Sequence, residues 1–259
     1  MSFNNKLKLF RIAARQNSSV IIRHVIENNI SRQTKNKNKN QSLCMFCAST
    51  NNLTKEHVVP SWTYEHSTDR VFITNINGLD QTYNKTTIPA CSICNNDRLA
   101  TIETYINELL THIDPDVIYF SVDEQSNIIR WLEIIDYKFQ ILNARRVFKA
   151  SKEKGFIPYL ADFPLSILRD NIEYSPNKAI AEMRRSQKRI TIKNKINNLN
   201  SLIVFKTSNK GFYFFHTMDN FIFIELPQHE IALFYFYKQK FPTIKAGHKA
   251  AMKIIDKAY

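Results

Sequence analysis

The sequence predicts an α+β protein built around a small cysteine-stapled unit, and three observations support this prediction. All four cysteines lie between residues 43 and 103, in two Cys-x-x-Cys pairs. A short β-prone run separates the pairs, and a helical pattern follows the second pair. Beyond residue 200 the chain changes to β-branched and aromatic runs divided by turn residues. We therefore expect flanking helices around the stapled unit and a C-terminal antiparallel β-meander.

The two cysteine pairs are Cys44 with Cys47 and Cys91 with Cys94. Two intervening residues allow a tight turn to direct both sulfurs to one point, and two such turns supply the four thiolates of a structural zinc site. A disulfide framework is the alternative, but it is typical of short secreted domains. This chain has 259 residues and no pattern of a signal peptide, so the sequence favours zinc.

The residues between and just after the cysteine pairs carry reactive groups. Glu56 stands beside His57 in a β-prone run that ends at Pro60, which cannot continue a strand ladder. Asn95 and Asn96 follow the second pair directly and open a helical pattern with apolar residues on one face. We expect this turn, hairpin and helix to bring Glu56, His57 and the first helical residues together.

This ordered set resembles the HNH, or ββα-metal, endonucleases, in the branch with two zinc knuckles around the catalytic hairpin. The resemblance covers about a quarter of the chain and rests on Cys-x-x-Cys, Leu-Thr-x-Glu-His-Val-x-Pro-x-Trp, Cys-x-x-Cys-Asn-Asn and a later Glu103. It implies a treble-clef-like ββα-metal core in which His57 is the general base. It also implies that Glu56 and Asn95 hold a catalytic Mg²⁺ or Mn²⁺. An imidazole that activates water and a hard, oxygen-bound cation suit phosphodiester hydrolysis.

The sequence departs from the family pattern at one supporting position. Members usually carry an Asn before the second knuckle to orient the base histidine, and Thr86 occupies the position that we would align. Asn84 lies two residues earlier and is the alternative. Glu103 is eight residues beyond Asn95, which is roughly 12 Å along a helix. We therefore assign Glu103 and Asn96 supporting roles.

The distribution of charge favours a polyanionic partner. The net charge is +13. Residues 42–130 carry five Lys and Arg against eleven acidic residues, a net charge of −6, whereas both flanking parts are basic. This pattern suits a carboxylate-lined metal site between segments that hold a polyanion. The resemblance implies that this polyanion is nucleic acid, and we expect DNA rather than RNA. The alternative is that abundant Asn, Lys and Ile reflect an AT-rich genome.

One helix concentrates the basic residues. Ser175-Pro176 has the form of an N-cap followed by Pro at the first helical position. The helix that follows carries five cations that we predict to contact phosphates, and they are Lys178, Arg184, Arg185, Lys188 and Arg189. A solvated basic face is the alternative interpretation. Aromatic residues of the C-terminal strands could stack on unpaired bases, but such residues are first of all core residues.

The organisation along the chain predicts three parts. Residues 1–41 read as a basic helical stretch, Phe3 to Asn29, and a linker, Arg32–Gln41; residues 42–125 form the nuclease domain, and residues 126–259 form a basic α+β accessory domain. The longest apolar runs are too short to span a membrane. We therefore expect a cytoplasmic protein without a membrane partner. No glycine-rich phosphate loop is present, which excludes a P-loop nucleotide hydrolase.

The leading hypothesis is a metal-dependent endonuclease that cuts DNA, with phage defence as a plausible setting by analogy. A second hypothesis is a zinc-stapled module that binds nucleic acid and has lost catalysis, because Thr86 replaces the expected Asn. A third is a nuclease effector that acts only with a partner protein or RNA. The sequence leaves these three open.

Overall fold

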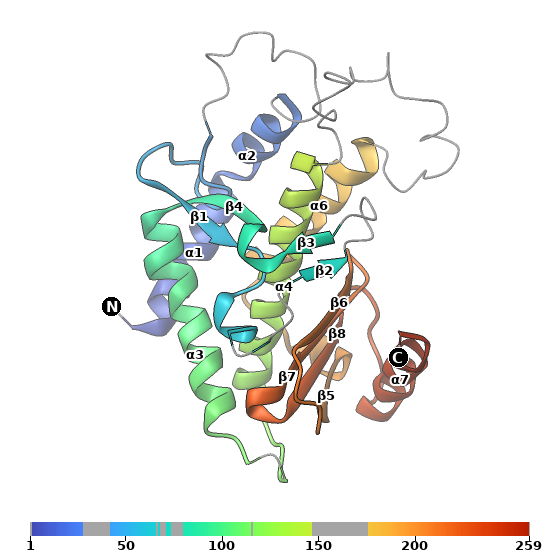
Figure 1. Ribbon diagram of the computed structural model, residues 1–259. Coiled ribbons are helices and arrows are strands. Elements are labelled where there is room, and N and C mark those ends of the chain that lie inside the picture. Colours follow the sequence, from blue (N-terminus) through green and yellow to red (C-terminus); the bar gives the residue numbers. More distant parts are fainter. Residues whose placement is uncertain are drawn as a thin grey trace, which may run out of the picture.

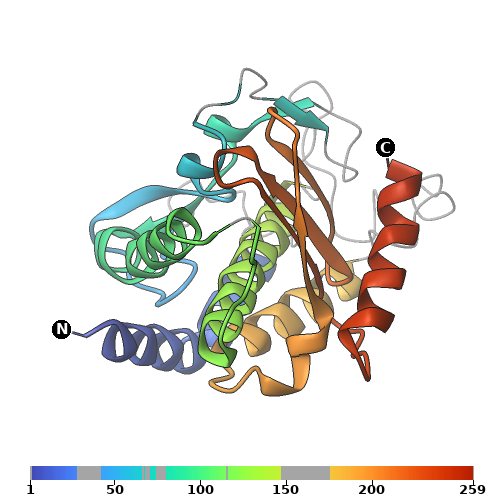
Figure 2. The same ribbon diagram turned by 90° about the horizontal axis from the view of Figure 1, so that it is seen from below.

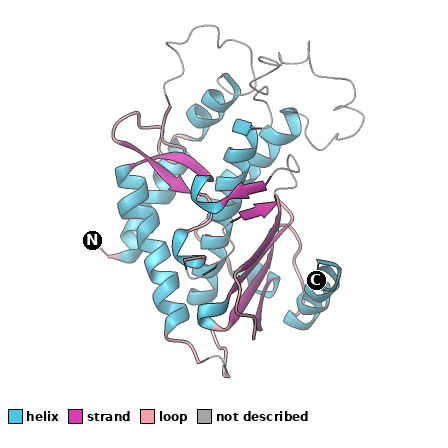
Figure 3. Ribbon diagram, in the orientation of Figure 1, coloured by secondary structure: helices cyan, strands magenta, loops and turns pink. Residues whose placement is uncertain are grey.

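The computed structural model describes residues 2–27, 42–65, 67, 71–73, 80–114, 116–146 and 176–258. The predicted linker Arg32–Gln41 lies outside them. Figures 1 and 3 show a mixed helix and sheet protein, which confirms the α+β class. The α-helices are α1 (Phe3–Gln16), α2 (Ser18–Val25), α3 (Ala100–Thr111), α4 (Val122–Arg146), α6 (Pro176–Thr191) and α7 (Ile244–Ala258). The strands are β1 (Leu53–His57), β2 (Val71–Ile73), β3 (Asp80–Thr82), β4 (Thr87–Cys91), β5 (Leu202–Lys206), β6 (Tyr213–Thr217), β7 (Phe221–Leu226) and β8 (Ile231–Phe236).

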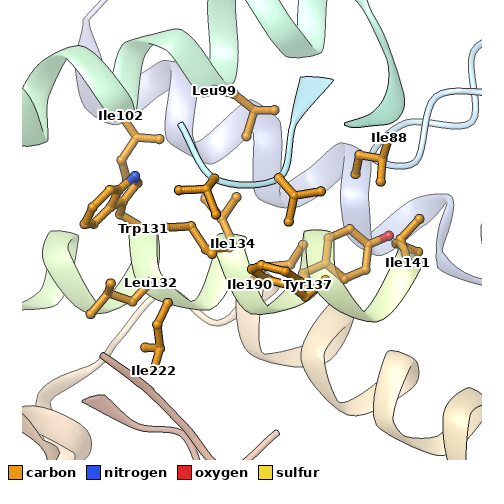
Figure 4. Close-up of a cluster of buried hydrophobic side chains, with 14 of the residues drawn as sticks. Ile88, Leu99, Ile102, Trp131, Leu132, Ile134, Tyr137, Ile141, Ile190 and Ile222 are labelled. Carbon is orange, nitrogen blue, oxygen red and sulfur yellow. The ribbon is translucent and has the colours of Figure 1, made fainter. Parts of the chain in front are cut away.

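Helix α4 is the centre of the hydrophobic core. Its residues 128–144 are buried on every side. Figure 4 shows Trp131 and Tyr137 of α4 among side chains of α3, β4 and α6, and Leu132 beside Ile222 of the C-terminal sheet. Each such large side chain stabilises the fold by roughly 1.5–3 kcal/mol when fully buried. A helix that contributes apolar residues in all directions is a core helix, not a surface helix.

The first helical stretch is divided in two. The sequence predicts one helix from Phe3 to Asn29, whereas α1 ends at Gln16 and α2 begins at Ser18. Asn17 stands between them, and its side-chain Nδ2 donates to the carbonyl oxygen of Ala13 at 2.9 Å. Such side-chain bonds offer the backbone an alternative to a regular helix, and this explains the break.

The central hairpin joins the two cysteine pairs. Strands β1 and β4 pair antiparallel, with Leu53 opposite Cys91 and His57 opposite Thr87. A π-helical turn, η6 (Ile93–Leu99), follows β4 and continues into α3. The chain therefore has the predicted order of hairpin and then helix.

The C-terminal sheet differs from the predicted meander. Its strand order is β5-β8-β7-β6, and all neighbours are antiparallel. Strands β6, β7 and β8 follow one another as a meander, but β5 pairs with β8 and not with β6, which is the order of a Greek key. In Figure 2 the sheet lies between α4 on one face and α7 on the other. Both faces of β8 are consequently buried, since all six of its residues are enclosed.

One hydrophobic cluster extends across the molecule. It contains Phe10 of α1, Ile88 of β4, Trp131 of α4 and Leu233 of β8. The three parts predicted from the sequence at 1–41, 42–125 and 126–259 therefore contribute to one core.

Candidate functional site

The four cysteines meet in one cluster. Two tight turns position them: the backbone N–H of Cys44 donates to the carbonyl of Ser49, and that of Ala48 donates to the carbonyl of Cys44. The ligand atoms of Cys44, Cys47, Cys91 and Cys94 all lie within 4.8 Å of one another, and the sulfurs of Cys47 and Cys91 are 3.5 Å apart. The four cysteines are therefore close enough to bind a metal such as zinc.

The donor set suits a closed structural site. Four thiolates in a tetrahedral arrangement are the typical ligands of structural zinc. Three of the four cysteines are buried. Hydrogen bonds from the neighbouring thiols, that of Cys44 first, lower the pKa of the Cys47 thiol. The hydrogen bond with Cys47 raises the pKa of the Cys44 thiol, and the hydrogen bond with Cys44 raises that of the Cys94 thiol, each with a contribution from burial. Because thiolates are the form that binds metals, binding of a metal would release protons from the cluster.

Asn95 fixes the start of the helix to the hairpin. Its side-chain Nδ2 donates to Oγ1 of Thr54 at 2.8 Å and lies 3.4 Å from the carbonyl oxygen of Lys55. Both acceptors belong to β1. The structure thus brings Asn95 to the catalytic strand that the sequence predicts, but it places the amide beside Thr54 rather than beside Glu56.

Glu56 has a buried lysine as its partner. Nζ of Lys138, on α4, donates a hydrogen bond to Oε1 of Glu56 and another to Oε1 of Glu103 on α3, the latter at 3.2 Å. Lys138 is completely buried and Glu56 is 5 % exposed. Burial by itself would lower the pKa of Lys138, but the charges of Glu56 and Glu103 outweigh it and raise this pKa. Glu56 therefore already has a cation beside it, namely an ammonium group from the chain.

Glu103 is the outer member of this cluster. Its side chain is 21 % exposed. Burial, together with the charge of Glu56, raises the pKa of Glu103 to about 7, and the charge of Lys138 opposes this rise. The supporting role that the sequence predicts for Glu103 agrees with its contact, because it shares the ammonium of Lys138 with Glu56.

His57 lies at the accessible edge of the hairpin. It is the last residue of β1 and is half-buried, whereas Glu56 next to it is buried. Successive side chains of a strand point to opposite faces. The carbonyl oxygen of His57 accepts a hydrogen bond from Nζ of Lys138 at 3.0 Å, which holds the end of the strand. By this alternation the imidazole and the carboxylate belong to different faces of β1, and Thr54, the partner of Asn95, shares the face of Glu56.

Thr86 supports the hairpin through its backbone. Its carbonyl accepts a hydrogen bond from the N–H of Val58 at 2.9 Å, and its hydroxyl donates to the carbonyl of Thr82 at 2.8 Å. Thr86 is buried. Asn96 is exposed on the first helical turn, and the side chain of Asn84 lies outside the described part of the structure.

The cations of the basic helix α6 differ in their exposure to solvent. Lys178, Arg184 and Lys188 are exposed on it. Arg189 is only 12 % exposed and pairs with Asp136 of α4 and with Asp219, which also pairs with Arg185. The predicted phosphate contact at Arg189 is therefore corrected: two carboxylates from the body of the protein enclose this guanidinium.

Sequence reasoning missed Lys138. Lys138 lies among large apolar residues between Trp131 and Leu142, together with Glu133 and Asp136, and this mixture gives no indication of which charged residues are buried. Its partners come from β1 and α3, far away in the sequence. The pattern along one helix therefore could not name them.

Comparisons with known proteins found no relationship. A scan against protein-family models gave no match, and neither did searches of curated proteins and of solved structures. Among the described residues, no helix combines the length and the apolar character needed to cross a membrane.

Proposed function

We propose that this protein is an HNH-type endonuclease that hydrolyses phosphodiester bonds of nucleic acid, DNA in preference to RNA, with His57 as the general base. The observation that supports this proposal most directly is the position of His57. It lies half-exposed at the end of a hairpin that the cysteine cluster and Asn95 tie to the following helix. A neutral imidazole can accept a proton from water and so act as a general base.

We assign a structural zinc ion to the cysteine cluster. The four sulfurs converge from the turn before β1 and from the end of β4 with the turn that follows it. A bound zinc ion would join the start of β1 to the end of β4, at the end of the hairpin opposite His57, and would leave no open coordination position for chemistry. Its role in the proposal is to hold His57 in place, not to react.

A catalytic Mg²⁺ or Mn²⁺ at Glu56 and Asn95 stays a prediction that the geometry does not favour. The carboxylate of Glu56 accepts a hydrogen bond from Lys138, and the amide of Asn95 donates to Thr54. A cation at Glu56 would have to share this carboxylate with the ammonium of Lys138. We therefore derive no catalytic step from a metal at this position.

Lys138 gives specific support to a second candidate function. An ammonium at the proposed ion site is compatible with a zinc-stapled module that binds nucleic acid without cutting it. In that case Glu56, Lys138 and Glu103 would stabilise the fold, and His57 would not act as a general base. The exposed cations of α6 would serve either function.

A nicking assay distinguishes the two functions. Supercoiled plasmid and single-stranded RNA are incubated with the protein and either Mg²⁺ or Mn²⁺. For a nuclease we expect His57→Ala to reduce nicking by roughly 10²-fold or more, in the range that general-base catalysis contributes. Lys55→Ala changes an exposed neighbour on the same strand and is the matched control. Binding of DNA without any nicking would select the second function, and equal nicking by wild type and His57→Ala would remove His57 from the mechanism.

A further inference from the structure

A groove beside α2 and α6 contains a concentration of positive charge. Its volume is about 610 Å³. The polar residues that line it are Arg15, Ser18, Ser19, Arg23, Glu27 and Arg184. They come from the end of α1, from α2 and the turn after it, and from α6, three segments that lie side by side.

The three guanidinium groups outnumber the one carboxylate. Arg15, Arg23 and Arg184 are exposed, and Glu27 is the acidic residue among the lining side chains. Arg11, one turn before Arg15 on α1, has its pKa lowered by burial and also by the charge of Arg15. Arg11 is therefore a further cation close to the Arg15 side of the groove.

Arg15 is held in position by the protein. Its Nη2 donates to the carbonyl oxygen of Thr191, at the end of α6, at 3.1 Å. A guanidinium carries five N–H donors in a planar fork, so further donors remain for a ligand. Arginine forks match the geometry of phosphate oxygens and bind them by two parallel hydrogen bonds.

A buried polar group behind the groove lacks a partner. Oγ of Ser18 donates to Oε1 of Gln187 on α6 at 2.7 Å. Gln187 is 2 % exposed, and within the described part of the chain its Nε2 has no hydrogen-bond partner. An unpaired buried donor is costly. The bond to Gln187 joins Ser18, which lines the groove, to α6, which carries Arg184.

We infer that this groove binds phosphate groups of a nucleic-acid backbone. The inference rests on the proposed function, because it assumes that nucleic acid is the ligand. It assigns Arg15 and Arg23, which the sequence analysis did not select, and it retains Arg184 from the basic helix. Successive phosphates follow a path longer than one contact, and three arginines on three segments suit such a path better than one isolated anion.

The salt dependence of DNA binding tests the inference. Binding of a short fluorescent duplex is measured by anisotropy without added Mg²⁺ or Mn²⁺, between about 50 and 200 mM salt, where each phosphate contact contributes about 0.9 to the slope of log K against log[salt]. For the triple variant Arg15→Gln, Arg23→Gln, Arg184→Gln we expect the magnitude of the slope to fall by about 2–3. The matched control is Lys245→Gln, Lys249→Gln, Lys253→Gln, which removes the same charge from exposed positions of α7. We expect its slope to change by less than one.

A second variant tests the groove independently of the arginines. Ser19→Glu places a carboxylate at an exposed lining position, and Ser208→Glu places one in the exposed loop after β5. Only Ser19→Glu should weaken binding, by roughly tenfold, which corresponds to about 1.4 kcal/mol. Equal losses in groove and control variants, or no binding by the wild type, would overturn the inference. Because no Mg²⁺ or Mn²⁺ is added, binding is measured separately from cleavage, and groove-dependent binding together with no nicking in the plasmid assay would reject the nuclease and leave the binding site intact.

Discussion

Lys138 of α4 and Glu56 of β1 form a buried ion pair that joins the central helix to the hairpin. The same ammonium reaches Glu103 and the carbonyl of His57. One cation thus fixes the strand on which the proposed general base lies. This pairing also bears on the role of Glu56. A buried carboxylate that pairs with a lysine of the same chain contributes to the stability of the fold, whether or not it contributes to catalysis.

Replacement of Lys138 by methionine should be strongly destabilising. Lys138→Met keeps the length of the side chain but leaves the carboxylate of Glu56 buried without its partner. Removing one member of a buried pair costs about 3–5 kcal/mol in the free energy of unfolding. Urea denaturation at pH 7 measures this change. The double variant Glu56→Gln, Lys138→Met should recover part of the loss; if the two losses simply add, the residues are not coupled.

Zinc should accompany the purified protein in a ratio of one ion per chain. Cys44→Ser removes one of the four ligands and should abolish zinc retention and lower the melting temperature, because a structural site contributes folding energy directly. Ser92→Ala, within the second Cys-x-x-Cys pair, should retain the metal. Elemental analysis and thermal melting give the two readouts. A wild-type protein that is folded and contains no zinc would contradict the assignment.

Stability should fall in acid because of Asp136. Burial would raise its pKa, but the hydrogen bond from His216 and the charge of Arg189 outweigh it and hold the pKa below its ordinary value. A lowered pKa in the folded state stabilises the protein above the unfolded value, about 3.9, and this contribution is lost as the pH falls through the folded value. Urea midpoints between pH 7 and pH 3 should show the loss.

Asp136→Asn provides the comparison for this pH dependence. The variant should be about 3–5 kcal/mol less stable at pH 7, because Arg189 loses a buried partner. Its stability should also depend less on pH below pH 4. Asp116→Asn is the control, since Asp116 pairs with Lys206 on the surface and is 78 % exposed. An unchanged acid profile in Asp136→Asn would show that other groups cause the loss.

Local patterns predicted the secondary structure of the C-terminal sheet well. The sequence predicts strands beyond residue 200, and β5 (Leu202–Lys206) and β7 (Phe221–Leu226) lie in that part of the chain. Alternating apolar residues between turn residues define a strand from its own sequence. The pairing of β5 with β8 was not expected, because pairing between strands separated along the chain depends on the packing of both faces of the sheet. The sequence of a single strand does not indicate that α4 and α7 cover the two faces of the sheet.

In the candidate site too, features set by nearby residues were predictable and contacts between residues distant in sequence were not. The spacing within each Cys-x-x-Cys pair was sufficient to predict that the four sulfurs meet. The partners of Glu56 and Arg189 were not predictable, because each belongs to a helix or loop distant in sequence. The sequence alone does not distinguish a charged residue that faces water from one that faces a buried carboxylate. Only the tertiary arrangement separates Arg184, which is exposed, from Arg189, which is enclosed.

Two glycine substitutions should have opposite effects on stability. Gly247 lies in α7, where alanine normally favours a helix by about 1 kcal/mol. A Cβ at this position would lie 2.6 Å from the carbonyl oxygen of Asn200 and 2.8 Å from Cδ1 of Ile203, so the helix would have to move away from β5. Gly247→Ala should therefore destabilise the protein by about 1–3 kcal/mol, the usual cost of overpacking.

Gly211 is the matched control for this clash. A Cβ at Gly211 would have no atom within 4 Å. Gly211→Ala should be neutral or should stabilise the protein by about 0.4–1 kcal/mol, because it reduces the freedom of the unfolded chain. Urea denaturation of both variants measures the difference. If Gly247→Ala is as stable as Gly211→Ala, α7 does not pack against β5 as closely as the structure shows, and the sheet is then covered on that face by a looser contact.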